Sequence, residues 1–287
     1  MSELARPFTR PPHPILVEPF VRTALAEDFG RAGDLTTDLL IDADQRVEAR
    51  IVARAPGTLS GLVCAAVALR LVDESAAITC GALDGENVGC GTSIATIQAR
   101  ARALLSTERV SLNFIGRLSG VATATRALVD AVAGTTTRVV CTRKTTPGLR
   151  MLEKYAVRCG GGLNHRFGLD DAVLIKDNHI AAVGSLRLAV ERARSGLGHM
   201  TRLEVEVDTM AQLDEALSLG VDTILLDNMS SAELKQAVEL ARGRAVLEAS
   251  GGISIETARE VALTGVDYIS SGAITHSAAA LDVGLDF

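Results

Sequence analysis

The feature that most restricts the fold is a regular alternation of short apolar runs and amphipathic segments from Arg138 onward. The strand-like runs are RVVCT, AVLIK, RLEVEV, TILLD, AVLEAS and YISSG, and helix-like segments such as TMAQLDEALSL and SSAELKQAVELA separate them. Repeated strand–helix units with right-handed crossovers form a parallel sheet, which is either open or closed into a barrel. No GxGxxG follows the first run, which disfavours the open dinucleotide-binding sheet. We therefore predict an α/β barrel with about six visible strands, fewer than the usual eight.

The first part of the chain has a different pattern. PILVEPFVRTALAED predicts an amphipathic helix and VEARIVARA a strand, after which a turn leads into a second helix at LVCAAVALRLV. SIATIQARARALL predicts another strand, and Ser106 is expected to cap the long helix that follows. Strands followed by helices are typical of a layered α+β domain. We place this N-terminal domain at residues 1–115 and the barrel at residues 116–287, with the last residues as candidates to pack back on the N-terminal domain.

Composition excludes several classes of function. The formal net charge is −6 and aromatic residues make up only 3% of the chain, whereas a general nucleic-acid binder needs a broad basic face and stacking platforms. The five cysteines form no CxxC pair and indicate reduced thiols rather than a disulfide framework. The N-terminus lacks the apolar stretch of a signal peptide, and the most apolar window is too short to span a membrane. We therefore expect a soluble, cytoplasmic protein.

Positive charge is nevertheless concentrated in one part of this acidic chain. The stretch RKTTPGLRMLEKYAVRCGGGLNHR holds several cations and a histidine but only one carboxylate, and Lys176 follows soon after it. The guanidinium groups of Arg143 and Arg166 suit planar carboxylates or phosphates, whereas lysines act as compact point charges. We interpret the cluster as a site for a small anion. At this point His165 is equally well explained as a donor in the site or as a core histidine with its hydrogen bonds satisfied.

Polar residues end most of the apolar runs in the barrel half, where the active sites of α/β barrels form. They are Arg143, Lys144, Lys176, Glu206, Asp227, Ser250, Gly251, Gly252, Ser271 and Gly272. Glu206, Asp227 and Glu248 stand 21 residues apart, which predicts equivalent places in successive strand–helix units. SGGIS and SSGAITH are small-residue loops before helices, where free backbone N–H groups bind phosphate. Ion pairs that only close the barrel, and ordinary capping turns, are the alternatives.

A resemblance to a known family follows from these motifs. TRKTTPGLRMLEKYAVRCGGGLNHRFGLDDAVLIKDNHI, with GDLTT, ERVSLNFIGRLSGVAT, LEVEVD, ILLDN, EASGGI and SSGAITH, resembles the quinolinate phosphoribosyltransferases over nearly the whole chain. The resemblance implies a type II phosphoribosyltransferase fold, with an N-terminal α/β sandwich and a C-terminal α/β barrel. It also implies a homodimeric pentosyltransferase of NAD biosynthesis that requires Mg²⁺. Such an enzyme converts quinolinate and phosphoribosyl diphosphate to nicotinate mononucleotide, diphosphate and CO₂.

The resemblance also implies roles for individual residues. Quinolinate would lie against Arg109 of the other chain, Arg143, His165, Arg166 and Lys176. The diphosphate would face Lys144, Lys176 and His276, and the 5′-phosphate would face Ser250, Gly251, Gly252, Ser271, Gly272 and Ala273. Thr142 completes the substrate-binding set. Lys144, Glu206 and Asp227 are the catalytic candidates, and Mg²⁺ would bind mainly through the diphosphate and water, with Glu206 and Asp227 as candidate ligands.

Four alternatives remain open. One is a phosphoribosyltransferase for a monocarboxylate such as nicotinate, and another is the related protein found with molybdenum-transport genes. A third is a non-catalytic protein that binds a phosphosugar or another anion on the same fold. The fourth, binding of nucleic acid, is already disfavoured by composition. Several convergent cations favour a diacid over a monoacid substrate, and carboxylates beside a phosphate site favour catalysis over simple anion binding.

Overall fold

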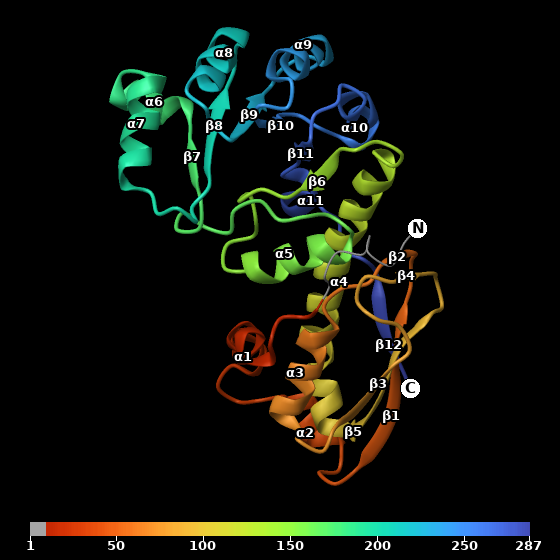
Figure 1. Ribbon diagram of the computed structural model, residues 1–287. Helices are drawn as coiled ribbons and strands as arrows, with labels where there is room; N and C mark the ends of the chain where they lie inside the picture. The colour runs from red at the N-terminus through yellow and green to blue at the C-terminus, as the bar shows by residue number, and fades with distance from the viewer. Residues whose placement is uncertain (1–9) are drawn as a thin grey trace. The chain divides into compact units, whose positions relative to one another are not determined.

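The computed structural model describes residues 10–287, which form two compact units (Figure 1). The first unit comprises the described residues up to Arg126 together with Thr145–Gly161 and Ile274–Phe287, and the second comprises Ala127–Lys144 and Gly162–Ala273. Each unit is therefore assembled from segments that are far apart in the sequence. The predicted domain boundary between residues 115 and 116 falls inside the continuous helix α4 (Ala101–Ala131) and stays a prediction.

The first unit is built on a four-stranded antiparallel sheet in the order β12, β1, β5, β3. These strands are β1 (Arg46–Ala53), β3 (Ala77–Cys80), β5 (Ser93–Arg100) and β12 (Val283–Asp286). Ile51 and Ile97 of the sheet share a buried core with Leu69 of α3 (Leu62–Val72) and with Leu104 and Ile115 of α4. The predicted layered arrangement of strands and helices is thus confirmed. Because β12 pairs with β1, the end of the chain belongs to this sheet.

Shorter elements complete the described part of the first unit. They are α1 (Pro14–Phe29), α2 (Leu35–Leu40), β2 (Gly57–Thr58), β4 (Asn87–Val88) and α5 (Arg150–Cys159), with α11 (Ala273–His276) at its junction with the second unit. Helix α1 packs against α3, and its buried residues Val17, Val21 and Leu25 recur with helical spacing. The helices predicted at both of these segments are confirmed.

The prediction that Ser106 caps the long helix is wrong. Helix α4 begins at Ala101, directly after β5, because the residues Ala-Arg-Ala-Leu-Leu that precede Ser106 are all strong helix formers. The Ser106 hydroxyl instead donates a hydrogen bond to Asp34 Oδ2 at 2.9 Å, and Asp34 is the residue that caps α2. Although α4 is long, no helix among residues 10–287 combines the length and apolar content needed to cross a membrane.

The second unit contains a six-stranded parallel sheet in the order β6, β11, β10, β9, β8, β7. The strands are β6 (Arg138–Val140), β7 (Val173–Ile175), β8 (Leu203–Val207), β9 (Thr223–Asp227), β10 (Val246–Ser250) and β11 (Tyr268–Ser270). All six predicted strand-like runs are therefore strands. Past the edge strand β6, Leu163 forms a parallel bridge with Val140, which brings the segment that carries His165 and Arg166 alongside the sheet.

Helices follow the strands and cover one side of this sheet (Figure 1). They are α6 (Asp177–Val183), α7 (Leu186–Gly196), α8 (Met210–Ser218), α9 (Ser231–Ala241) and α10 (Ile255–Ala262). Adjacent helices pack on each other from α6 through α10 in chain order. Capping boxes begin α8 at Thr209 and α9 at Ser230, so each strand-to-helix turn ends at a defined residue. The parallel α/β architecture predicted for this half of the chain is confirmed.

The pairing of strands corrects one expectation about the site. Glu206 pairs with Leu225 and Leu225 with Glu248, whereas Asp227 pairs with Ser250. Asp227 consequently lies two residues nearer the carboxyl edge of the sheet than Glu248, and the prediction of equivalent places for Glu206, Asp227 and Glu248 is wrong. Paired positions stand 19 residues apart from β8 to β9 and 23 apart from β9 to β10, and the connection through α9 is longer than the connection through α8.

Arg117 of α4 holds several segments of the first unit together. Its guanidinium donates to Glu153 Oε1 of α5 at 2.7 and 3.0 Å, and also to the carbonyl oxygens of Thr275 and Ala278. The Glu153 side chain is fully buried, and its other oxygen accepts a hydrogen bond from the Thr146 backbone N–H at 3.0 Å. Removing the cation would leave a buried carboxylate without its counter-charge, which is strongly destabilising.

We expect Arg117→Leu to lower the free energy of unfolding by about 3–5 kcal/mol, measured by urea denaturation followed by circular dichroism. The matched control is Arg22→Leu, because Arg22 forms an exposed helical ion pair with Glu18 at 2.6 Å. Loss of such a pair costs less than about 1 kcal/mol. Equal losses in the two variants would contradict the role assigned to Arg117.

Candidate active site

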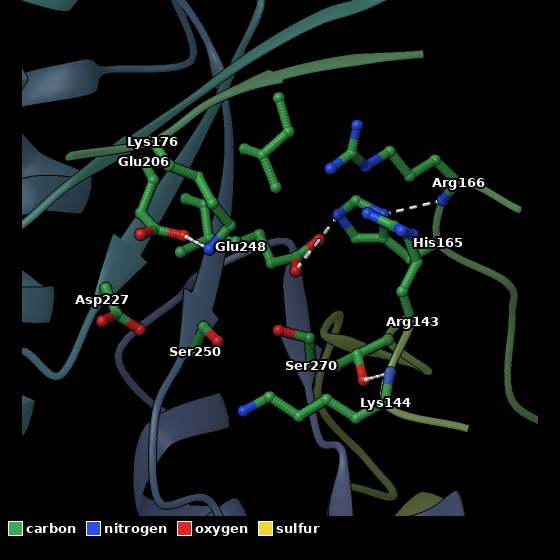
Figure 2. Close-up of a pocket in the computed structure, with 13 residues that line it drawn as sticks. Arg143, Lys144, His165, Arg166, Lys176, Glu206, Asp227, Glu248, Ser250 and Ser270 are labelled. Atoms are coloured by element: carbon green, nitrogen blue, oxygen red, sulfur yellow. Dashed lines mark hydrogen bonds and ion pairs between the residues drawn. The ribbon is translucent and has the colours of Figure 1, made fainter. Parts of the chain in front are cut away.

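A cavity of about 290 Å³ lies at the carboxyl ends of the strands in the second unit (Figure 2). Its lining residues are Thr142, Arg143, Lys144, His165, Arg166, Leu174, Lys176, Glu206, Leu225, Asp227, Glu248, Ser250 and Ser270. Nine of them were predicted to bind substrate from the sequence: Thr142, Arg143, Lys144, His165, Arg166, Lys176, Glu206, Asp227 and Ser250. The fold therefore gathers most of the predicted set around one cavity, while the role of each residue stays a prediction.

Five other predicted residues lie just outside the lining. Gly251 and Gly252 follow Ser250 at the end of β10, and Ser271, Gly272 and Ala273 follow Ser270 at the end of β11. Gly251 has a positive φ of 96°, and a Cβ there would lie 2.1 Å from the Asn228 side chain, so this position requires glycine. Both loops continue directly from residues that line the cavity.

The remaining two predicted residues belong to the first unit. Arg109 is exposed on α4. His276 ends α11, where its Nδ1 atom shares a hydrogen bond with the Ser277 hydroxyl at 2.6 Å. The role across a dimer that the family resemblance implies for Arg109 stays a prediction.

One side of the cavity carries a cation directly bound to a carboxylate. Lys176 follows β7, and its Nζ atom donates to Glu206 Oε2 of the adjacent strand β8 at 2.5 Å. The Lys176 backbone N–H donates to His179 Nδ1 at 2.9 Å, which fixes the chain where α6 begins. At the end of β9, Asp227 Oδ2 accepts a hydrogen bond from the Asn228 side-chain amide at 2.7 Å. Two carboxylates and a lysine thus meet at neighbouring strand ends.

The opposite side of the cavity carries two guanidinium groups (Figure 2). The Lys144 backbone N–H donates to Thr142 Oγ1 at 3.0 Å, which turns the chain after β6, and Arg166 Nη1 donates to the Ala172 carbonyl oxygen at 3.2 Å. Burial and, secondarily, the positive charge of Arg143 lower the pKa of Arg166. A bound anion would counter the second of these effects, so this side of the cavity is suited to a negatively charged ligand.

Beneath the guanidinium groups, His165 contacts two buried carboxyl groups. His165 Nδ1 accepts a hydrogen bond from the Arg166 backbone N–H at 2.7 Å, so the neutral ring carries its proton on Nε2. Nε2 lies 2.9 Å from Glu204 Oε2 and 3.8 Å from Glu248 Oε1. The ring therefore lines the cavity and also has both nitrogens engaged by the protein. The sequence left open whether His165 is a donor in the site or a histidine with its hydrogen bonds satisfied by the protein, and each interpretation describes part of its environment.

Glu248 is the most perturbed acid at this site. Its exposed fraction is 5%, and that of Glu204 is 7%. Burial first, and the nearby charge of Glu204 second, raise the pKa of Glu248 to about 7, while His165 acts in the opposite direction. Glu248 is thus an acid that holds or releases a proton near neutral pH.

Sequence reasoning assigned no function to five residues at this site, namely Glu204, Glu248, Leu174, Leu225 and Ser270. The two glutamates carried a signal, because Glu204 alternates with Glu206 along one face of β8 and Glu248 continues the 21-residue spacing. The two leucines lie in ordinary apolar runs, and nothing in the sequence distinguishes them from core residues. Their contribution became visible only once the strands were paired.

The fold and the cavity together define a class of protein. A parallel α/β sheet carries its polar residues at the carboxyl ends of the strands, as α/β enzymes do. The cavity combines four cationic side chains with carboxylates, so it is suited to a polyanionic substrate and to charge separation during a reaction. These features define an α/β enzyme that acts on small anionic molecules.

Comparison with known proteins identifies the family. Family models described as the N-terminal and C-terminal domains of quinolinate phosphoribosyl transferase match residues 34–119 and 121–286. The nicotinate-nucleotide pyrophosphorylase (carboxylating) of Mycobacterium leprae is 45% identical over 274 residues, which cover 93% of this chain and 95% of that protein. The chain therefore belongs to the quinolinate phosphoribosyl transferase family.

Solved structures agree with this assignment. The crystal structure of NadC from Streptococcus pyogenes is 40% identical, has a TM-score of 0.94 and covers 97% of this chain and 98% of that one. The crystal structure of nicotinate-nucleotide pyrophosphorylase from Ehrlichia chaffeensis is 44% identical, with a TM-score of 0.89 and coverage of 93% and 97%. The predicted fold class, with a separate antiparallel sheet and a parallel α/β sheet, is thus confirmed.

The raised pKa of Glu248 predicts a dependence of stability on pH. Because the folded protein binds this proton more tightly than the unfolded chain, the contribution is complete below the ordinary value of 4.5 and is lost as the pH rises through about 7. We expect the free energy of unfolding to fall by on the order of 2 kcal/mol over this range, and to fall less in Glu248→Gln. Urea denaturation at a series of pH values measures this difference.

The control for this measurement is Glu239→Gln, at an exposed position on α9. Its dependence on pH is expected to match that of the unsubstituted protein. A Glu248→Gln variant with the same slope as this control would show that Glu248 does not change its proton affinity on folding.

Proposed function

We propose that this chain transfers the phosphoribosyl group of phosphoribosyl diphosphate to the ring nitrogen of quinolinate and removes the 2-carboxylate as CO₂. The products are nicotinate mononucleotide and diphosphate, and the reaction supplies NAD synthesis. Membership of the family and the name of the Mycobacterium leprae relative, a carboxylating nicotinate-nucleotide pyrophosphorylase, support this reaction. The structural observation that carries the proposal is the convergence of cations and carboxylates on one cavity.

Quinolinate is a dianion, and the guanidinium side of the cavity is suited to it. Arg143 and Arg166 repel each other, so two carboxylates placed beside them remove an unfavourable interaction as well as adding hydrogen bonds. A monocarboxylate would leave part of this positive charge unmatched. Nicotinate has only one carboxylate, so these two arginines disfavour it as the substrate. His165 is predicted to bind quinolinate in this part of the site, and its Nδ1 atom also accepts a hydrogen bond from the Arg166 backbone N–H.

The other side of the cavity is suited to the sugar donor. Loss of diphosphate develops positive charge on the ribose and negative charge on the leaving group. All four residues assigned to this half of the reaction line the cavity, which supports the proposal that Glu206 and Asp227 stabilise the ribose and that Lys144 and Lys176 stabilise the diphosphate. The loops after Ser250 and Ser270 are the proposed site of the 5′-phosphate, because small-residue loops that lead into helices bind phosphate through backbone N–H groups. Much of the acceleration would come from holding the two substrates in line.

The residues present also fit the Mg²⁺ that the family resemblance implies. Glu206 and Asp227 supply carboxylate oxygens at the cavity, which are the ligands that Mg²⁺ prefers. Mg²⁺ would be held mainly through the diphosphate and water, with these two carboxylates facing its hydration shell. When bound, Mg²⁺ supplies positive charge that stabilises the diphosphate leaving group.

Two further parts of the proposal concern assembly and specificity. The functional unit is a homodimer in which Arg109 reaches the cavity of the other chain. A purely anion-binding role is disfavoured, because Glu206 and Asp227 would repel phosphate in the absence of a metal. The matched relatives carry enzyme names, which also supports catalysis over binding alone. Cytoplasmic localisation stays a prediction.

The proposed reaction needs two substrates and a metal ion. We expect nicotinate mononucleotide to form only when quinolinate, phosphoribosyl diphosphate and Mg²⁺ are all present, as measured by chromatography with ultraviolet detection. Lys144→Ala should lower kcat by about 10²–10³-fold, because it removes a charge that faces the diphosphate. Lys235→Ala, on the exposed surface of α9, is the matched control. A rate with nicotinate equal to that with quinolinate would contradict the diacid assignment.

The second functional prediction concerns the dimer. Arg109→Ala and Lys144→Ala should each inactivate the enzyme, since each lacks one part of the composite site. Mixed dimers contain one complete site, so a statistical mixture should recover up to about a quarter of the unsubstituted activity. The measurement is the rate after the two variants are unfolded together and refolded. A mixture as inactive as its components would rule out a site shared between chains.

A further inference from the structure

A second cavity, of about 400 Å³, lies at the opposite ends of the same strands. Glu204, Thr223, Val246 and Tyr268, which come from the first two residues of β8, β9, β10 and β11, contribute to its lining. Besides His165 and Arg166, only Glu248 appears in the lining of both cavities. The two spaces therefore approach each other from opposite ends of the sheet, and Glu248 belongs to the layer that separates them.

Strand pairing explains why Glu248 has this place. Side chains two residues apart on a strand point to the same face, so Val246, Glu248 and Ser250 form one column along β10. Val246 lines the second cavity, Ser250 lines the first, and Glu248 lies between them and lines both. Its paired neighbour Leu225 is apolar, which leaves Glu248 as the ionisable group of β9 and β10 at this level.

The Glu248 carboxyl group is buried and incompletely bonded. Its Oε1 atom has no hydrogen-bond partner among the described residues, and Glu204 Oε1 also lacks one. His165 Nε2 lies 2.9 Å from Glu204 Oε2 and 3.8 Å from Glu248 Oε1, so the ring has one N–H available for two carboxyl groups. Two buried carboxyl groups beside one imidazole favour retention of a proton, and the pKa of about 7 places that proton on Glu248.

The proposed reaction requires such a proton. When the 2-carboxylate departs as CO₂, the electron pair of the broken bond stays on ring carbon 2, and this carbon must then gain a proton. Glu204 and His165 face Glu248, and the other ionisable groups that line the first cavity are Arg143, Lys144, Arg166, Lys176, Glu206 and Asp227. In the proposed reaction Lys144 faces the diphosphate, and Glu206 and Asp227 face the ribose. Guanidinium groups do not release protons in proteins, and the His165 proton is directed at Glu204. Lys176 is paired with Glu206.

We propose that Glu248 is the acid that protonates ring carbon 2 after decarboxylation, and that water in the second cavity returns the proton to Glu248. The inference rests on the proposed function. The bond between ring carbon 2 and the carboxylate carbon breaks, and the electron pair left on the ring takes the Glu248 carboxyl hydrogen. Glu248 becomes a carboxylate and regains one proton from solvent through the second cavity. One proton is consumed per CO₂ released, and nothing is oxidised or reduced.

Glu204 and His165 act in this scheme as positioning residues. Glu204 accepts the Nε2 proton of His165, which holds the imidazole ring against the Arg166 backbone. Its negative charge also favours the protonated form of Glu248. Because the second cavity lies at the amino ends of the strands, the proton can return while substrates fill the first cavity.

A single-turnover experiment separates the protonation that follows decarboxylation from the earlier transfer of the phosphoribosyl group. Enzyme in excess is mixed with quinolinate, phosphoribosyl diphosphate and Mg²⁺, quenched at short times, and assayed for diphosphate, the carboxylated nucleotide and nicotinate mononucleotide. We expect Glu248→Gln to release diphosphate at nearly the unsubstituted rate but to form nicotinate mononucleotide about 100-fold more slowly. The carboxylated nucleotide should accumulate. Glu248→Asp, which keeps an acid, should recover part of the lost rate.

Two further variants complete the design. Glu239→Gln, exposed on α9, should behave as the unsubstituted enzyme in both steps. Val246→Phe fills the second cavity without removing any acid. It should give one fast turnover per site followed by slow turnovers, because Glu248 then regains its proton slowly. This burst tests the route even if Glu248→Gln fails to fold.

The outcomes distinguish the inference from the proposed function. If the unsubstituted enzyme forms no nicotinate mononucleotide, the proposed function fails. If it is active and Glu248→Gln slows diphosphate release and nucleotide formation equally, the function stands and the inference is overturned. Unchanged rates in Glu248→Gln would overturn it as well. A Val246→Phe variant with no burst would overturn the route through the second cavity.

Discussion

The site depends on the repulsion between cationic side chains that the fold holds together. Arg143 and Arg166 face the same cavity as Lys144 and Lys176, and the charge of Arg143 contributes to the lowered pKa of Arg166. Such a cluster is unfavourable unless opposite charge lies nearby. The protein supplies part of that charge through Glu206, which pairs with Lys176. A local cluster of cations around one cavity is suited to a small polyanion even in a chain of net charge −6.

The parallel sheet allows many polar residues to gather at one cavity while each strand stays buried. Short strands place one polar residue each at the same edge, and their apolar residues are buried against the helices. No strand has to carry more than a few charges, so every strand keeps enough apolar surface to pack. The bridge between Leu163 and Val140 extends this edge with a segment that is not a regular strand, and that segment positions His165 and Arg166. The arrangement of side chains around the cavity thus comes from the backbone pairing of the sheet.

Strand alternation also explains why the interior has two chemically different cavities. Val246 and Ser250 are four residues apart on β10 and line different cavities, and Glu248, two residues from each on the same face, lines both. Glu248 is buried beside Glu204, and burial contributes most to its raised pKa. Position in the fold is therefore enough to bring the pKa of an ordinary carboxyl group close to neutral pH.

Local patterns in the sequence determined the elements and most of the cavity lining. Apolar runs separated by amphipathic segments were enough to find all six strands of the parallel sheet, because burial of a strand is recorded in its own residues. Polar residues at the ends of those runs identified Lys176, Glu206 and Asp227, because parallel strands bring their carboxyl ends to one edge. The family resemblance added the roles of these residues, and the matched relatives support the reaction.

Only the tertiary structure decided which residues of adjacent strands lie opposite each other and the residue at which α4 begins. Equal spacing in the sequence placed Glu248 level with Asp227, but the pairing of β9 with β10 puts Ser250 opposite Asp227 and leaves Glu248 two residues lower, in the layer between the cavities. Ser106 resembled a cap, yet its hydroxyl has a better partner in Asp34, which is distant in the sequence. Pairing register and long-range hydrogen bonds depend on segments far apart in the chain. A reading of local periodicity cannot determine them.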